Sequence, residues 1–223
     1  MNHPASDSIL DLSVRELLER LGSSDPAPGG GAAAALAGAL GAALVQMTAN
    51  LSIGRPKLAD VEHQTRQIEA RAGELRQQLA ELGDADAQAF ERVSTAYKLP
   101  RQDDAQKAER ARAIQSALRG AALVPLRTAH LCVDLMALAE DAAPLLNPAV
   151  ISDVMVGACL AQASLESAAL NVEVNLVALT DPSVVEPLQM GLDRARSGAG
   201  ERLARVLDKG RSRGGLSKPI SKR

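Results

Sequence analysis

The sequence predicts an all-α fold, a single-domain antiparallel bundle of about six helices. Only Phe90 and Tyr97 are aromatic among 223 residues, and tryptophan is absent, whereas β-sheets rely on aromatic and β-branched side chains. Ala, Leu, Glu, Arg and Gln, which favour helices, dominate the composition. The hydrophobic share of 46% is enough to bury a sizeable core.

Apolar periodicity and helix-breaking residues set the expected elements in order. The first helix is expected to end at Gly22, the third at Pro100 and the fifth before the turn Asp181-Pro182-Ser183. Gly83 marks one expected bend, and Gly120 and Pro125 together mark an expected kink. The expected helices cover residues 8–21, 32–51, 59–99, 103–140 and 152–179, and a last segment ends near 207.

Charge is distributed unevenly along the chain. Residues 209–223 hold six Lys or Arg and no acid, so the net charge of −2 leaves −8 on residues 1–208. We expect residues 1–208 to form the domain and 209–223 to form a basic, disordered tail. A tether for nucleic acid or an anionic substrate is one interpretation of the tail, and a solvated terminus is the preferred one. The acidic, aromatic-poor body predicts no nucleic-acid partner.

Cysteines, histidines and the N-terminus bear on compartment and metal binding. Cys132 and Cys159 lie in apolar helical segments, which indicates small buried thiols in a reducing compartment. His3, His63 and His130 lack metal-ligand spacing, so no metal is expected. The first residues show neither the charged nor the apolar region of a secretory signal. These features favour a cytoplasmic location.

The most distinctive segment is Pro26-Ala27-Pro28-Gly29-Gly30-Gly31, which leads into an Ala-, Gly- and Leu-rich helix without charge up to Gly54. A helix N-terminus presents backbone N–H groups and the positive end of a dipole. Glycines let a ligand approach these groups closely. No Lys-Ser/Thr follows and no strand precedes the loop, which argues against a nucleotide-binding loop. The alternative is a tight connection between two helices.

The same helix has the length of a membrane span. We expect it to be buried within the protein or at a subunit interface instead, because it has few large apolar residues and carries Gln46, Thr48 and Asn50 near one end. No other segment is expected to be comparable. The sequence therefore predicts no membrane association.

A carboxylate shares a helix face with both aromatic side chains. Spacings of four, three and four residues place Asp86, Phe90, Val93 and Tyr97 on one side of the helix. The pattern fits a core stripe, and it also fits a site where rings flank a flat ligand and the carboxylate binds it or moves protons. Periodicity alone favours the core stripe.

Two polar clusters follow in the second half of the chain. Ser152 or Asp153, which come after Asn147-Pro148, are expected to cap the next helix. Asn171 and Asn175 lie one turn apart on an apolar helix, where buried amides need hydrogen-bond partners. Their face is therefore expected to meet another polar helix or a ligand.

Together these segments resemble the cyclodeaminase/cyclohydrolase family, which includes the C-terminal domain of formiminotransferase-cyclodeaminase and stand-alone bacterial methenyltetrahydrofolate cyclohydrolases. The matching segments run in order through most of the chain, over residues 26–31, 50–54, 86–101, 147–153 and 168–175. The resemblance implies an all-helical homodimer that acts on one-carbon derivatives of tetrahydrofolate. It also implies that the protein needs neither a metal nor a prosthetic group.

The resemblance also implies roles for individual residues. Asp86 is the first choice for the carboxylate that stabilises a cationic methenyl bridge and accepts a proton from water, and Asp153 is the second. Lys57, Arg55 or Arg101 would pair with the glutamate carboxylates of the substrate. The other residues expected to bind substrate are Pro28, Gly29, Gly30, Gly31, Asn50, Phe90, Tyr97 and Asn175.

Two reactions occur in this family. The chain has no room for a formiminotransferase domain, so the expected reaction is hydrolysis of 5,10-methenyltetrahydrofolate to 10-formyltetrahydrofolate. The alternative is a formiminotetrahydrofolate cyclodeaminase, which closes the methenyl ring and releases ammonia. A non-catalytic helical scaffold or folate-binding protein, in which the same residues pack helices, is the alternative from another class.

Overall fold

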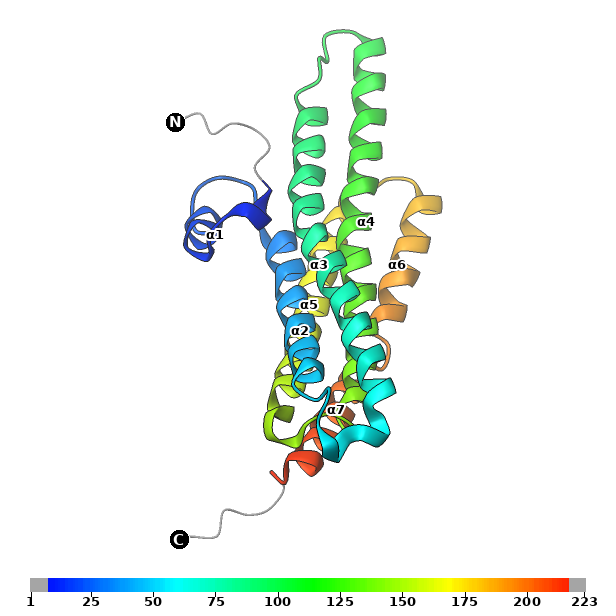
Figure 1. Ribbon diagram of the computed structural model, residues 1–223. Helices are drawn as coiled ribbons and strands as arrows, with labels where there is room; N and C mark the ends of the chain where they lie inside the picture. Colours follow the sequence, from blue (N-terminus) through cyan, green and yellow to red (C-terminus); the bar gives the residue numbers. More distant parts are fainter. Residues whose placement is uncertain (1–7, 217–223) are drawn as a thin grey trace, which may run out of the picture.

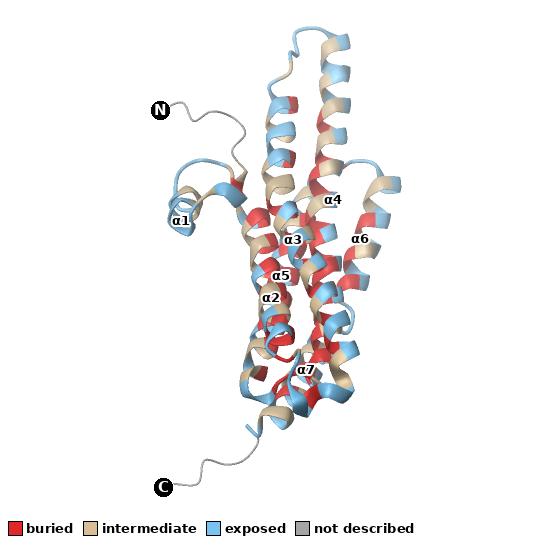
Figure 2. Ribbon diagram, viewed as in Figure 1, coloured by how far each residue is buried: buried red, intermediate tan, exposed pale blue. Residues whose placement is uncertain are grey.

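A computed structural model of the chain describes residues 8–216. It confirms the all-α prediction, because every regular element in that range is helical (Figure 1). Four long antiparallel helices form the bundle, and buried residues concentrate where they meet (Figure 2). Helix α2 packs on α3 and α5, and α4 packs on the same two helices. Their bounds are α2 Gly30–Asn50, α3 Glu62–Tyr97, α4 Asp104–Ala142 and α5 Ile151–Ala178.

Shorter elements flank this bundle. Helix α6 (Pro182–Arg196) packs on α4 and α5, and α7 (Ala199–Gly214) crosses the same two helices at one end. Three short 3-10 turns connect or precede the helices, η1 at Ile9–Asp11, η2 at Pro56–Val61 and η3 at Pro148–Val150. The ends of α3 and α4 project together beyond the start of α2 (Figure 1). Helix α3 runs without interruption through Gly83, and α4 through Pro125.

The first predicted helix is wrong in its extent. The chain forms η1, breaks at Leu12 and restarts as α1 (Val14–Leu21). Ser13 starts α1 with a capping box, since its hydroxyl accepts a hydrogen bond from the Glu16 N–H and the Glu16 carboxylate accepts one from the Ser13 N–H. No residue of α1 is buried, and Leu18 is 63% exposed. Helix α1 thus lies to one side of the bundle, outside its core (Figure 1).

The last predicted helix and the predicted tail also differ from the structure. Gly198 adopts a φ of 73°, which separates α6 from α7. Helix α7 continues to Gly214, so residues 209–214 are helical where a disordered tail was expected. Lys209 pairs with Glu140, and Arg213 donates hydrogen bonds to the Leu145 and Leu146 carbonyls. Residues 217–223, the rest of the predicted tail, lie outside the described range.

Small side chains let the bundle helices approach closely. Gly41 on α2 and Gly157 on α5 meet where these helices cross, and a Cβ on either would lie 2.7 Å from the carbonyl oxygen of the other. Nearby, the Ser164 hydroxyl donates a hydrogen bond of 2.6 Å to the Ala34 carbonyl. The buried Cys132 thiol donates to Ser164, and burial raises its pKa to about 11. Cys159, which was also expected to be buried, is exposed.

Three helical segments, rather than α2 alone, have the length and apolar composition of a membrane span. They are Gly30–Asn50, Asp104–Ala142 and Pro148–Ala178, and their most apolar windows are 50%, 56% and 39% buried within the protein. The expectation that no segment resembles α2 is therefore wrong. Each of the three helices belongs to the bundle described above, and each buries part of its apolar surface against its neighbours.

Glu140 fastens α7 to α4. Its carboxylate accepts hydrogen bonds from Arg205 and Lys209 and lies 3.4 Å from Arg202. The hydrogen bond from Arg205 contributes most to a pKa of about 2 for Glu140. The folded state therefore favours the ionised carboxylate.

We expect Glu140→Gln to lower the free energy of unfolding by about 1 kcal/mol at neutral pH, because it removes the acceptor of this ion-pair network. The Glu140 contribution is complete above the usual pKa of a glutamate and is lost as the pH falls through about 2. Urea denaturation at several pH values measures the difference. Asp208→Asn, at an exposed position of α7, is the control for loss of a carboxylate and should have little effect.

Candidate functional site

The start of α2 faces the carboxylate of Asp86 on α3. Gly29 caps α2 without a side-chain hydrogen bond, and the Ala32 N–H donates to the Asp86 carboxylate instead. A Cβ on Gly31 would overlap that carboxylate. Asp86 therefore caps the N-terminus of α2 from a neighbouring helix, as an N-cap Asp does from within its own chain segment. This contact is possible only because residue 31 is glycine.

Asp86 is held in a poorly solvated position. Burial raises its pKa above the usual range of an aspartate, and the hydrogen bond from Ala32 opposes that shift in part. No cationic side chain in residues 8–216 contributes to the shift. A carboxylate that is partly desolvated and lacks a cationic partner is suited to a cationic ligand or to proton transfer.

Asp86 opens onto a cavity of about 420 Å³ between the start of α2 and helices α3, α4 and α5, here called the Asp86 cavity. Gly29, Gly30 and Gly31 form one wall, and Phe90 and Val93 from α3 form another. Leu118 and Ala121 of α4 complete the apolar lining. The volume and the mostly apolar lining are typical of a small-molecule site.

Asn171 and Asn175 supply the polar groups of the opposite wall. The Asn175 amide nitrogen donates hydrogen bonds to the carbonyls of Ala121 and Asn171, and the Asn171 amide nitrogen donates to Ser167. Within the described residues neither amide oxygen accepts a hydrogen bond, so both are available to a ligand with N–H groups. Both residues line the Asp86 cavity, and the expectation that their face meets a ligand stays a prediction.

Three predicted site residues lie at the other end of the bundle. Asn50 ends α2, and the twenty residues that separate it from Gly30 correspond to about 30 Å of helix. Lys57 lies in the exposed turn η2 that follows. Asp153 lies in the first turn of α5, far from Asn171 on the same helix. None of the three belongs to the Asp86 cavity of its own chain.

The expected caps of α5 are also wrong. Helix α5 begins at Ile151 with Val150 as its N-cap residue, without a side-chain hydrogen bond. The Asn147 side chain caps the preceding turn η3 by accepting a hydrogen bond from the Ala149 N–H. Ser152 and Asp153 lie inside the helix because η3 runs directly into it.

Tyr97 and Arg101 lie beyond the cavity. Tyr97 ends α3 and is 48% exposed, and its ring packs under the Arg110 guanidinium at 5.7 Å from the ring centroid. Arg101 is exposed in the connection to α4. Of the four residues predicted to share one face, Asp86, Phe90 and Val93 line the cavity and Tyr97 does not.

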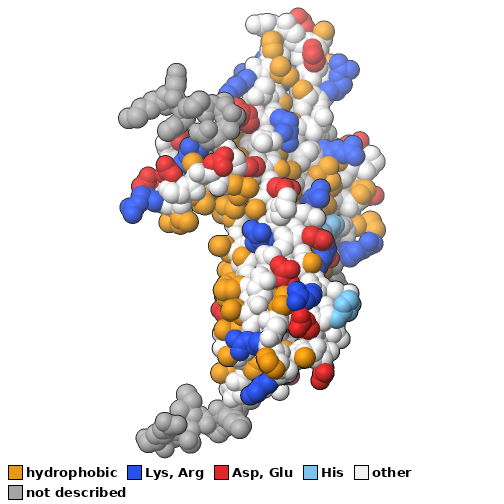
Figure 3. Space-filling model, in the orientation of Figure 1, with side chains coloured by type: hydrophobic (Ala, Val, Ile, Leu, Met, Phe, Trp, Pro, Cys, Tyr) orange, Lys and Arg blue, Asp and Glu red, His pale blue; other side chains and the backbone are white. Residues whose placement is uncertain are grey.

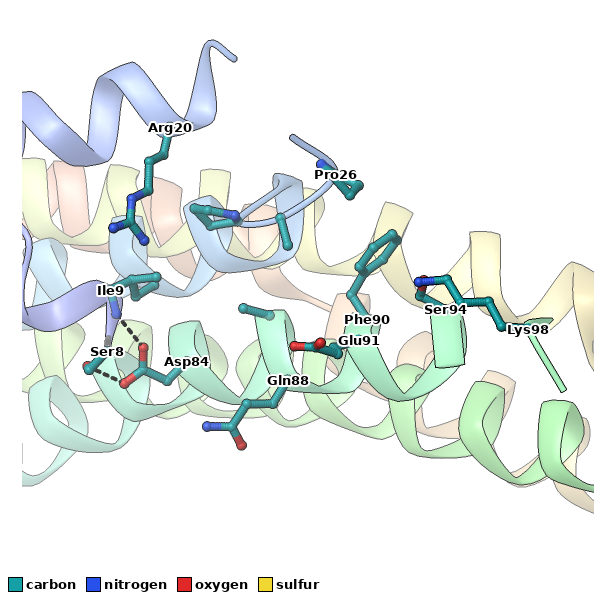
Figure 4. Close-up of a pocket in the computed structure, with 13 residues that line it drawn as sticks. Ser8, Ile9, Arg20, Pro26, Asp84, Gln88, Phe90, Glu91, Ser94 and Lys98 are labelled. Carbon is teal, nitrogen blue, oxygen red and sulfur yellow. Dashed lines mark hydrogen bonds between the residues drawn. The ribbon is translucent and has the colours of Figure 1, made fainter. Parts of the chain in front are cut away.

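A second cavity of about 480 Å³ lies on the other side of the loop that leads into α2 (Figure 4). Arg20 of α1 and Lys98, directly after α3, line it together with Pro28 and Phe90. We call it the Arg20 cavity. Sequence reasoning missed both cations as site residues, because Arg20 lies outside every matching segment and Lys98 occupies a variable position within residues 86–101. Figure 4 shows Arg20 near Ile9 and Asp84 at one end of this cavity and Lys98 beyond Phe90 at the other.

In residues 8–216, no group of three or more His, Cys, Asp or Glu side chains is placed to hold a metal ion. The polar groups of the Asp86 cavity are one carboxylate, two amides and the glycine backbone. They are suited to bind a flat, cationic, nitrogen-rich ligand and to move protons.

Comparison with known proteins bears on the fold and the family of the chain. A sequence model of formiminotransferase-cyclodeaminase matches residues 13–194. Methenyltetrahydrofolate cyclohydrolase of Methylorubrum extorquens is 41% identical over 88% of this chain and 94% of its own length. Formimidoyltransferase-cyclodeaminase of Mus musculus is 35% identical over 78% of this chain and 32% of its own length, so the match covers about a third of that relative. A crystal structure of formiminotetrahydrofolate cyclodeaminase from Thermotoga maritima has a TM-score of 0.82 and 28% identity, and the match covers 92% of this chain and 98% of that one.

We expect Gly31→Ala to lower the free energy of unfolding by about 1–3 kcal/mol, because its Cβ would overlap the Asp86 carboxylate and force it from the start of α2. Gly30→Ala is the matched control. Its Cβ would lie 3.6 Å from the Asn171 amide, an ordinary contact, and the loss of a flexible glycine should stabilise the fold by about 0.4–1 kcal/mol. Urea denaturation compares the two variants, and equal stabilities would contradict the contact between Gly31 and Asp86.

Proposed function

Because this chain belongs to the formiminotransferase-cyclodeaminase family, we propose that it is a methenyltetrahydrofolate cyclohydrolase, an enzyme that hydrolyses 5,10-methenyltetrahydrofolate to 10-formyltetrahydrofolate. The match to a stand-alone cyclohydrolase over nearly the full length of both chains supports this choice. The observation that carries it is the desolvated Asp86 carboxylate, without a cationic partner in the described residues, beside a cavity lined by glycine backbone and two amides.

The charge of the substrate matches the site. The methenyl bridge between N5 and N10 is a delocalised cation, and a carboxylate in a poorly solvated cavity stabilises such a charge more strongly than water does. The amide oxygens of Asn171 and Asn175 would accept hydrogen bonds from the amino and ring N–H groups of the pterin. Phe90 and Val93 would pack against the flat rings.

The reaction requires one water molecule and releases one proton. The water oxygen forms a bond with the methenyl carbon as Asp86 accepts one of its protons, and a neutral carbinolamine results. The bond from that carbon to N5 then breaks, the remaining hydroxyl becomes the formyl carbonyl, and N5 takes up a proton. N10 keeps the formyl group. Asp86 therefore acts as a general base, and its raised pKa makes it a stronger base than an exposed aspartate.

A cyclodeaminase is the second candidate. The solved relative from Thermotoga maritima, which matches this chain over almost its whole length, is named formiminotetrahydrofolate cyclodeaminase. In that reaction N10 attacks the formimino carbon, ammonia leaves and the methenyl cation forms, so the same carboxylate would stabilise the product. Release of ammonia from 5-formiminotetrahydrofolate distinguishes the two activities. If the protein binds folate and catalyses neither reaction, the binding-protein alternative is favoured.

We expect Asp86→Asn to lower turnover of 5,10-methenyltetrahydrofolate at least about 100-fold, since an amide cannot accept the proton. The variant should be as stable as the parent chain or more stable, because burial disfavours the charged carboxylate. Loss of the near-ultraviolet absorbance of the methenyl substrate measures the rate. Asp153→Asn is the control at the second predicted carboxylate and should retain most activity. Full activity in Asp86→Asn would exclude Asp86 as the base.

The raised pKa of Asp86 predicts the pH dependence of the rate. The carboxylate becomes protonated as the pH falls through its raised pKa, and the protonated form cannot act as a base. The acidic limb of the kcat/KM profile should therefore lie above the usual range of an aspartate. A profile that stays flat through that range would show that another group accepts the proton.

The proposal includes a homodimer. Exposed hydrophobic side chains gather along the flank formed by α2 (Figure 3), and they include Leu40, Met47 and Leu51 of α2. Neighbouring α5 exposes Leu170, Val174 and Val177. An apolar surface of this kind on two adjacent helices is typical of a subunit interface. We also propose a cytoplasmic location, in keeping with two free cysteines, Cys132 and Cys159.

Leu40→Glu tests the dimer, because it places a charge at the centre of the exposed α2 side chains. We expect it to shift the protein toward the monomer in sedimentation equilibrium at micromolar concentration. Leu123→Glu makes the same change at an exposed position of α4 and should leave the assembly unchanged. A parent chain that sediments as a monomer would contradict the proposed dimer.

A further inference from the structure

Helix α1 is amphipathic, and its own chain leaves the apolar side uncovered. Leu17, Leu18 and Leu21 follow Val14 at distances of three, four and seven residues, which places all four on one side of the helix. None of them is buried, and Val14 and Leu18 are 74% and 63% exposed. Within the described residues α1 has no extensive packing against another helix. A helix of eight residues is only marginally stable by itself, so α1 requires a surface that covers this side.

Both ends of α1 are fixed near the start of α2. Before α1, the Asp84 carboxylate of α3 accepts hydrogen bonds from the Ser8 hydroxyl and the Ile9 N–H. After α1, residues 22–29 lead directly into α2. Figure 3 shows hydrophobic atoms on the lower side of α1 and along the flank of α2 below it, and the two surfaces outline a recess. A second molecule in this recess would cover both surfaces at once.

The exposed flank of α2 has the spacing of a seam between two helices. Intervals of three and four residues separate Ala37, Leu40, Leu44 and Met47 of α2 and Leu51 directly after it, and none of these residues is buried. This is the a/d spacing with which one helix packs along another. No residue from 29 to 54 is charged, so burial of this flank leaves no charge unpaired. The spacing fits a helix as the occupant, and a second copy of the chain supplies the same seam by two-fold symmetry.

Charge selects the orientation of the two copies. Residues 11–25, which contain α1, hold four acids and two arginines. Residues 51–59, which follow α2, hold Arg55 and Lys57 and no acid. A parallel pair would bring the two acidic α1 segments together, whereas an antiparallel pair places each of them beside the cationic turn of the other copy. The antiparallel pair also opposes the dipoles of the two α2 helices, which is favourable.

We propose that two copies pack α2 against α2 in antiparallel orientation, and that α1 of each copy covers the end of α2 and the turn η2 of the other. Two-fold symmetry about the middle of the seam brings the start of α2, where α1 projects, beside residues 47–58 of the second copy. Val14 and Leu18 would pack there on Leu51 of the second copy. This inference rests on the homodimer proposed above and adds α1 to its interface.

The polar side of α1 argues against a membrane as the occupant. It carries Arg15, Glu16, Glu19 and Arg20, whose charges cancel. Helices that lie on anionic membranes are rich in Lys and Arg on their polar side. A second copy therefore matches both sides of α1 better than a lipid surface does.

Sedimentation equilibrium tests the contribution of α1 to the dimer. Leu18→Gln should raise the dissociation constant of the dimer at least about tenfold, because it places an amide in an apolar contact. Leu18 is not part of the core, so the variant should fold like the parent chain. Leu123→Gln makes the same change at an exposed leucine of α4 and should leave the dissociation constant unchanged.

Photocrosslinking tests which chain α1 contacts and in which orientation. The photoreactive residue p-benzoylphenylalanine is placed at Leu18, and at Leu123 as the control. Labelled (nitrogen-15) and unlabelled chains are mixed and equilibrated before irradiation, so that mass spectrometry separates crosslinks between chains from those within one chain. Position 18 should join labelled to unlabelled chains within residues 47–58, and position 123 should not reach that segment.

Several results would overturn the proposal and leave the homodimer in place. They are crosslinks from position 18 within one chain only, crosslinks to residues 8–25 of the second copy, which indicate a parallel pair, and an unchanged dissociation constant in Leu18→Gln. A monomeric parent chain overturns both the homodimer and the role of α1. Binding of the parent chain to phosphatidylserine vesicles that Leu18→Gln abolishes would make a membrane the occupant instead. Hydrolysis of 5,10-methenyltetrahydrofolate by the same preparations decides the enzymatic proposal separately.

Discussion

Helix α2 lacks side chains at the points where its neighbours come closest, and the rest of the structure depends on this. Where α2 crosses α5, Gly41 and Gly157 bring the two backbones into contact. At its start, Gly31 leaves room for the Asp86 carboxylate. Both contacts fail for any residue larger than glycine. The close approach of α3 and α5 to α2 is what encloses the Asp86 cavity.

This arrangement places a carboxylate where the fold itself derives little benefit from it. Asp86 is partly buried, has no cationic partner in the described residues, and receives a backbone hydrogen bond from Ala32. Glu140 shows the opposite case, since three cations surround it and its pKa falls to about 2. The Glu140 network holds α7 in place, whereas Asp86 retains an unneutralised charge. A residue that costs stability and lines a cavity is characteristic of a functional site.

Some of the predicted site residues line the Asp86 cavity, and others lie at the opposite end of the bundle. Gly29, Gly30, Gly31, Asp86, Phe90 and Asn175 are all recognisable from the sequence and all line the Asp86 cavity. Their signals are local, since a glycine run, a helix face and a pair of amides one turn apart are each visible in a short window. Asn50, Lys57 and Asp153 belong to equally recognisable segments, but antiparallel helices carry them to the opposite end of the bundle. Sequence order says which helix a residue belongs to and leaves open which ends of different helices meet.

The sequence by itself determined the helical class, the approximate bounds of the four long helices and the place of α2 within the bundle, because these follow from composition and from periodicity within each segment. Only the tertiary structure decided that Asp86 caps α2, that Tyr97 lies outside the Asp86 cavity and that Arg20 of α1 lines a second cavity with Phe90. It also decided that α7 continues past Lys209. Lys209 pairs with Glu140, and Arg213 donates hydrogen bonds to the carbonyls of Leu145 and Leu146, partners that the sequence does not reveal. Each of these outcomes rests on a contact between helices far apart in the chain, which no periodic pattern within one helix records.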